Sequence, residues 1–134
     1  MSESTLTADE RALLIYLILA VTAHQKRQTP GRNRFLVLTV HFALRAGLLE
    51  TAEACRKVVK QDSPQHVLSK HSSVVEAAKS DLFPPLVKQL QRHCSLERAE
   101  QLATGQEEEL LQTDSAAFQK TVSQLISRIQ TQST

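Results

Sequence analysis

Two apolar segments near the start of the chain limit what it can fold into. Ten consecutive apolar residues run from Ala12 to Val21, and the segment FLVLTVHFAL at residues 35–44 is nearly as apolar. As a helix, either segment would present apolar side chains in every direction, so both must be surrounded by protein. The two segments are therefore predicted to lie back to back at the centre of the fold.

The rest of the composition favours helices around that centre. Only three glycines and four prolines interrupt the 134 residues, and no Asn-Gly or Asp-Gly pair is present to close a β-hairpin. Ala, Leu, Gln, Glu, Lys and Arg dominate, and all are strong helix formers. We predict one all-α domain over residues 1–134, a compact bundle of six or seven helices arranged as successive helical hairpins, with frayed tails at 1–6 and 131–134.

Capping residues and helix breakers indicate where the helices begin and end. Thr7 with Glu10 forms a capping-box pattern, which predicts a first helix from Ala8 to about Lys26. A second helix is predicted at 32–46, between the break Thr29-Pro30-Gly31 and Gly47, and a third from residue 48, with an apolar stripe through Ala52, Cys55 and Val59.

The second half of the chain contains shorter predicted elements. One or two helical turns are expected in PQHVLSK at 64–70, a helix from Ser73 to about Ser80, and a helix that starts in Pro84-Pro85 after an extended Phe83. A further helix is expected from Ser95 to Gly105, and a last one capped by Thr113 or Asp114, with an apolar stripe from Phe118 to Ile129.

A short pattern recurs at an offset of 47 residues. Arg45 followed by LLETAE at 48–53 corresponds to Arg92 followed by SLERAE at 95–100. In both copies the arginine is expected near a helix end, and Leu-Glu-x-Ala-Glu opens the next helix. The spacing is in the range of HEAT and armadillo repeats, although solenoids usually need three copies or more. A chance match between common helix-forming residues is the alternative.

The first apolar segment, ALLIYLILAVTA at residues 12–23, raises the question of a membrane or secretory role. A membrane-spanning helix needs about 20 apolar residues, so this segment is too short. Val21-Thr22-Ala23 resembles a signal-peptide cleavage site, but the residues before the apolar run are acidic where a signal is positive. We therefore expect a buried first helix in a cytoplasmic protein without membrane contact, with Cys55 and Cys94 as reduced, buried thiols.

No catalytic or metal-binding motif is evident. The three glycines are isolated, which excludes the usual phosphate-binding loop, and no two histidines have the i, i+4 spacing of a helical metal site. We therefore expect no enzymatic activity, no metal and no cofactor. A small enzyme is the least favoured hypothesis, and it would need a pocket that joins His41 or His93 to a carboxylate such as Glu50 or Glu97.

Basic residues gather between the two apolar segments. Arg32 and Arg34 are expected beside free N–H groups in the first turn of the second helix, with Lys26 and Arg27 opposite, an arrangement suited to an anion. His41 and Arg45 fall within about 20° of Arg34 around a helix. The predicted anion-binding residues are Lys26, Arg27, Arg32, Arg34, His41 and Arg45. The alternative is a solvated helix face whose charges pair with neighbouring acids.

Two functions follow from these features. The favoured one is a non-enzymatic helical protein–protein interaction module whose partner is another protein or a second copy, because a further chain could cover part of the first two helices. The alternative is binding of an anion or a nucleic-acid backbone through residues 26–45. Two features argue against nucleic-acid binding: the pI is only about 8.7, and the few aromatic residues are predicted to lie in the core.

Overall fold

The computed structural model describes residues 5–130, which form α-helices and one 3-10 helix and contain no strand. The elements are α1 (Ala8–Gln25), α2 (Thr29–Arg45), α3 (Leu49–Asp62), α4 (Val74–Ala78), α5 (Phe83–His93), α6 (Leu96–Glu107), η1 (Glu108–Gln112) and α7 (Phe118–Ser127). The predicted all-helical bundle is confirmed. Residues 1–4 and 131–134 of the expected frayed tails lie outside the described residues; of the other two, Thr5 is exposed and Leu6 is partly buried against the core.

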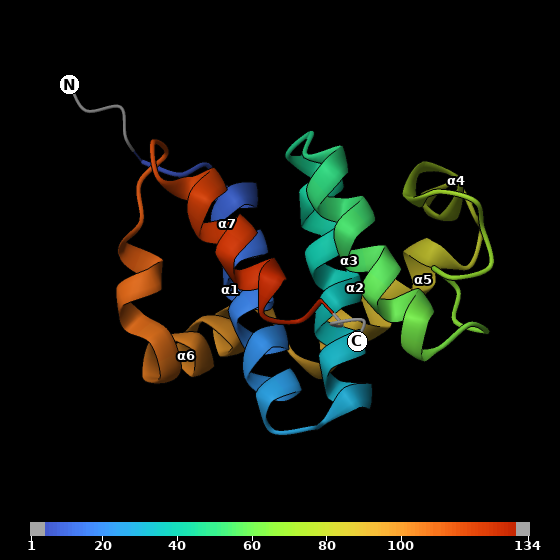
Figure 1. Cartoon of the computed structure of the whole chain (residues 1–134), viewed down its shortest axis with the longest axis horizontal. Coiled ribbons are helices and arrows are strands. Elements are labelled where there is room, and N and C mark those ends of the chain that lie inside the picture. Colours follow the sequence, from blue (N-terminus) through green and yellow to red (C-terminus); the bar gives the residue numbers. More distant parts are fainter. Residues whose placement is uncertain (1–4, 131–134) are drawn as a thin grey trace.

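The centre of the bundle is the hairpin of α1 and α2 (Figure 1). Every residue from Ala12 to Val21 is at most 3% exposed, because α2, α6 and α7 all pack against α1. On the other side of the hairpin, α3 and α5 cover α2. The prediction that the two apolar segments form the shielded centre is confirmed. The bundle's own helices surround them, so these segments give no argument for a covering second chain.

The first helix begins as expected, and the second begins earlier than expected. Thr7 accepts a hydrogen bond from the backbone N–H of Glu10, whose carboxylate accepts one from the N–H of Thr7. The predicted break at Thr29-Pro30-Gly31 is wrong, because α2 already starts at Thr29 and Pro30 lies in its first turn, where no N–H is needed. The chain reverses before this, at residues 26–28, where Arg27 has a φ of 60°.

A glycine ends α2 as predicted. Gly47 has a φ of 77°, and its N–H donates to the carbonyl of Leu44 at 3.1 Å. The next N–H, of Leu48, reaches back to the carbonyl of Ala43 at 2.8 Å, which completes a Schellman-type end. The chain therefore turns back directly, and α3 packs along α2.

Residues 63–73 form turns, so the predicted short helix in PQHVLSK is wrong. The segment is held by tertiary contacts: Leu68 is fully buried, and Arg56 of α3, only 3% exposed, donates to the carbonyls of Leu68 at 3.4 Å and His71 at 3.0 Å. Arg56 also pairs with Glu53, whose carboxylate accepts from the N–H of Val74 at 2.8 Å. A buried guanidinium thus satisfies carbonyls that a helix would have satisfied internally.

Two predicted boundaries around α5 and α6 are also wrong. Phe83 is the first residue of α5 although Pro84 follows it; its side chain is buried, which outweighs the steric preference for extended backbone before proline. Gly105 lies inside α6, since one glycine costs a helix only about 1 kcal/mol relative to alanine. Glu107 consequently ends α6, and Glu108 and Glu109 form the first turn of η1.

The last helix has the predicted apolar stripe but not the predicted cap. The stripe residues are all buried: Phe118, Val122, Leu125, Ile126 and Ile129. The N-cap is Ala117, without a side-chain hydrogen bond, so the prediction of Thr113 or Asp114 is wrong. Asp114 instead accepts from the N–H of Ala117 and closes the turn before the helix.

The two copies of the 47-residue pattern have different surroundings. Both open a helix, and Ala52 and Ala99 are both fully buried. However, α3 packs along α2 as a hairpin, whereas α6 leaves α5 and packs against α1 (Figure 1). The second copy therefore does not form a hairpin repeat equivalent to the first.

Candidate functional site

Arg32, at the centre of the predicted anion site, is engaged inside the protein. It is 7% exposed, its Nε and Nη2 donate to Asn33 Oδ1 at 3.1 and 3.0 Å, and its Nη1 donates to His24 Nδ1 at 3.1 Å. Asn33 in turn donates to Asp62 at 3.1 Å and to Ser63 at 3.3 Å. Burial, and then the Arg32 charge, lower the pKa of His24, which keeps its ring neutral as an acceptor. This network fastens the α1–α2 turn to the end of α3.

The other predicted basic residues are spread along the hairpin. Lys26 and Arg27 are exposed in the turn, and Arg34 is exposed on α2. Arg45, at the opposite end of α2, forms an ion pair with Asp9 at 3.0 Å. Half-buried His41 lies edge-on to Phe42, 4.8 Å between ring centroids, and burial followed by Arg45 lowers its pKa against the opposing effect of Asp9.

The structure therefore does not gather all six predicted residues around one point. Arg32 and Arg45 have protein partners, while Lys26, Arg27 and Arg34 remain open to solvent near the start of α2. Anion binding stays a prediction for these three residues.

The histidines and cysteines do not converge on a reactive centre. Among residues 5–130 no group of three His, Cys, Asp or Glu could hold a metal ion. Burial raises the pKa of the Cys55 thiol to about 12. Cys94 is half-buried, and not fully buried as predicted; burial raises its pKa too, against the opposing charge of Arg98. The cavity lined by His93 has no carboxylate in its lining, and the hollows lined by Glu50 have no histidine.

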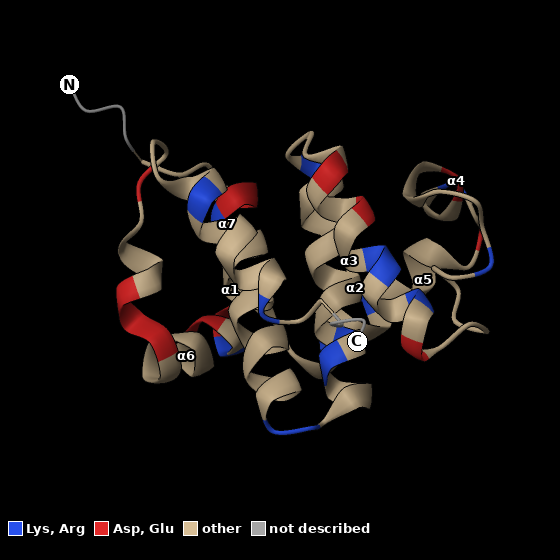
Figure 2. Ribbon diagram, in the orientation of Figure 1, with Lys and Arg blue, Asp and Glu red and all other residues tan. Residues whose placement is uncertain are grey.

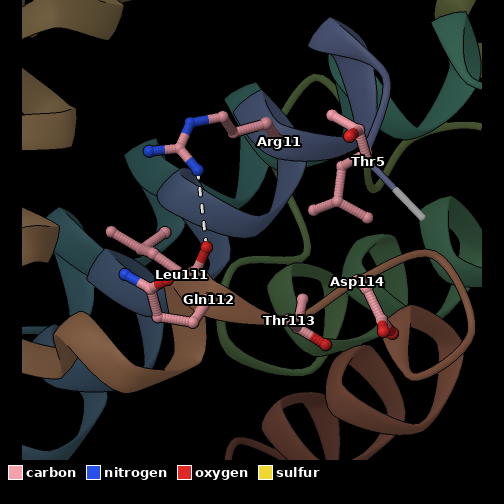
Figure 3. A pocket seen from close by; sticks show the side chains of 7 residues that line it. Thr5, Arg11, Leu111, Gln112, Thr113 and Asp114 are labelled. Atoms are coloured by element: carbon pink, nitrogen blue, oxygen red, sulfur yellow. Dashed lines mark hydrogen bonds between the residues drawn. The ribbon is translucent and has the colours of Figure 1, made fainter. Parts of the chain in front are cut away.

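One hollow lies where the N-terminal segment meets the loop before α7 (Figure 3). Its volume is about 330 Å³, and Arg11 reaches across it. The guanidinium donates to the carbonyl of Leu111 at 3.4 Å and pairs with Glu100 at 2.6 Å. Asp114 is used by the turn before α7. The polar groups here hold the elements together, so this hollow is a structural junction.

A second surface, on the outside of α3, combines apolar side chains with unpaired charges. A hollow of about 500 Å³ separates α3 from α4; it is mainly apolar, and exposed Leu49 and Val75 lie on its two sides. A further hollow of about 290 Å³ separates α3 from α7. Glu50, Ala54 and Gln130 line both. The outer stripe of α3 is thus a ridge with a hollow on each side.

We call this surface the α3 face, defined by Leu49, Glu50, Ala54 and Lys57 of α3 together with Val75 of α4. At about 100° per residue, Glu50, Ala54 and Lys57 lie within about 60° of one another around the helix. Along this stripe the acidic Glu50 comes first and the basic Lys57 follows; Figure 2 also shows the acidic last residue of α3, Asp62, beyond the basic ones. Neither Glu50 nor Lys57 forms an ion pair with another described residue.

The sequence contained a signal for this surface. Glu50, Ala54 and Lys57 have the i, i+4, i+7 spacing of one helical stripe, opposite the buried stripe of Ala52, Cys55 and Val59. The sequence could not show that α4 and α7 lie on either side of this stripe, because their positions depend on tertiary packing.

Comparisons with known proteins leave this surface as the main guide to function. A scan against protein-family models, a search of curated proteins and a search of solved structures each find no match to the chain. Within residues 5–130, no helix has the length and hydropathy needed to cross a membrane.

Proposed function

We propose that the protein is a non-enzymatic interaction module of the cytoplasm that pairs with a second copy of itself through the α3 face. The observation that carries the proposal is the order of charges along the exposed stripe of α3. Glu50 lies on one side of the small residue Ala54 and Lys57 on the other, and neither forms an ion pair with another described residue. A surface with this order of charges is complementary to a second copy of itself that is related by a two-fold rotation.

A two-fold axis beside Ala54 would bring two α3 helices together antiparallel. Glu50 would then face Lys57 of the second copy, and the same pair would recur on the other side of the axis, as an isologous contact requires. The offset of seven residues between the two charges corresponds to about 10 Å along the helix. Alanine at the centre permits a helix separation at the short end of the usual range, about 8 Å.

The hollows on either side of α3 would accept the apolar edges of the second copy. Ridges of one helix pack into grooves of another, and exposed Leu49 and Val75 are apolar side chains placed to fill them. Each exposed ion pair contributes only about 0.2–1 kcal/mol, so the charges set the orientation and apolar burial supplies most of the affinity. We expect a weak, reversible dimer.

Charge exchange tests the proposal. Sedimentation of the wild type over micromolar to millimolar concentrations should show a monomer–dimer equilibrium. Glu50→Lys and Lys57→Glu should each weaken it roughly tenfold, because two attractive pairs become repulsive. The double variant Glu50→Lys/Lys57→Glu should restore dimerisation, since the pairs re-form with exchanged signs.

A matched control separates the contact from any effect on the helix itself. Glu97 is the second residue of α6, as Glu50 is of α3, so Glu97→Lys makes the same charge change at an equivalent helix start. It should leave the dimer unchanged. A monomer at all concentrations, or a double variant no better than the single ones, would overturn the proposal.

A further inference from the structure

A small, partly open cavity lies between the first turns of α2 and the end of α5, on the other side of α2 from α3. Its volume is about 220 Å³. Phe35, Leu38 and Leu90 form an apolar wall, and the polar side chains of the lining are those of Gln28, Arg34, His93 and Cys94. It shares no lining residue with the α3 face, so it requires an explanation of its own.

The walls of the cavity are fixed by the core. The Phe35 ring stacks on Tyr16, 6.5 Å between centroids with an interplanar angle of 30°. The Tyr16 hydroxyl donates to the carbonyl of Cys94 at 2.8 Å, which holds the end of α5 against α1. A cavity bounded by such groups keeps its shape without a ligand, and preformed sites lose less free energy on binding.

The charge around the cavity has one sign. Arg34 is exposed and forms no ion pair with any described residue. No Asp or Glu lines the cavity. The adjoining first turn of α2 has no acidic residue and no side-chain cap, so its positive end adds to the same potential.

We propose that this cavity binds a small monocarboxylate with a compact apolar body, the carboxylate on Arg34 and the body against Phe35, Leu38 and Leu90. Size limits the ligand, because cavities of about 150 Å³ already hold a benzene ring. A fork of guanidinium N–H groups matches the two oxygens of a carboxylate. The cavity is too small for a nucleic-acid backbone.

Benzoate is a suitable probe, with benzyl alcohol as its uncharged counterpart. In a titration of the full-length protein followed by NMR amide shifts, benzoate should saturate a site at residues around the cavity, and benzyl alcohol should bind about tenfold more weakly. Arg34→Gln should weaken benzoate by a similar factor. Arg92→Gln, which removes an exposed arginine of α5 that does not line the cavity, should change nothing.

The Cys94 thiol gives an independent readout. Cys55 is fully buried, so alkylation should report on Cys94, and saturating benzoate should slow that reaction in the wild type but not in Arg34→Gln. The proposal is overturned if benzoate does not saturate, if benzyl alcohol binds equally well, or if Arg34→Gln binds benzoate like the wild type.

Discussion

The α2–α3 and α5–α6 junctions begin from the same sequence pattern and end in different structures. After α2, Gly47 takes a φ of 77° and the chain folds back on itself. After α5, Cys94 has φ −142° and ψ 92°, and Ser95 has φ −65° and ψ 161°, so two successive residues are extended. The first junction makes a packed hairpin, and the second sends α6 to the other side of the hairpin formed by α1 and α2 (Figure 1).

The difference shows that the residues between two helices determine how the helices pack more than the first residues of the second helix do. Only the first junction has a glycine that enters the left-handed region at low cost. The shared Leu-Glu-x-Ala-Glu sets a helix start and one buried alanine in each copy, and nothing more.

The largest expected effect on stability comes from a residue that α3 has and α6 lacks at the matching position. Arg56 of α3 is buried against Glu53 and the 63–73 loop, and the matching position of α6 is Ala103. Arg56→Ala should lower the free energy of unfolding by about 3–5 kcal/mol, because it leaves a carboxylate and several carbonyls without their donor. Urea denaturation measures this. Arg98→Ala, at an exposed position of α6, should stay within about 0.5 kcal/mol of the wild type.

A glycine substitution tests the comparison directly. Gly47→Ala should destabilise by about 1 kcal/mol, because alanine is strained at a φ of 77° although its Cβ would meet no atom within 4 Å. Gly105→Ala should stabilise by about 0.5–1 kcal/mol, since Gly105 is an exposed residue inside α6. Thermal denaturation of the two variants should give shifts of opposite sign. Equal signs would remove the left-handed glycine as the cause of the hairpin.

A smaller expected effect is a pH dependence of stability that arises from histidines in the N-terminal half of the chain. Burial lowers the pKa of His24, His41 and His66 below the ordinary 6.5, and His66 Nδ1 accepts from the N–H of Leu68 at 3.0 Å. The folded state therefore prefers neutral rings. Stability should be complete above about pH 7 and should fall as pH drops through the ordinary histidine range. Urea midpoints at pH 7.5 and 5.5 measure the loss, which His66→Gln should reduce.

Features set by neighbouring residues were predictable from the sequence. The capping box at Thr7, the left-handed Gly47 and the apolar segment at 12–21 depend on contacts within a few residues or on burial in every direction, and all three were predicted correctly. Phe83 and the 63–73 loop were not, because burial of a phenylalanine and the long reach of Arg56 override local preference.

The candidate sites divide in the same way. Three residues of the α3 face, Glu50, Ala54 and Lys57, were visible in the sequence as one stripe, but the packing of α4 and α7 on either side of them was not. The basic cluster was visible in the sequence as a run of basic residues. The sequence could not show that Arg32 hydrogen-bonds to Asn33 and His24 or that Arg45 forms an ion pair with Asp9.

The position of Tyr16 gives the protein a built-in optical label. It is the chain's single tyrosine, and there is no tryptophan to dominate its fluorescence. Its ring lies between Phe35 and Phe42, and burial followed by the nearby Cys94 raises its pKa to about 12. Emission and alkaline absorbance therefore report on one known point, where α1, α2 and the end of α5 meet, so loosening of that junction can be followed in the unmodified protein.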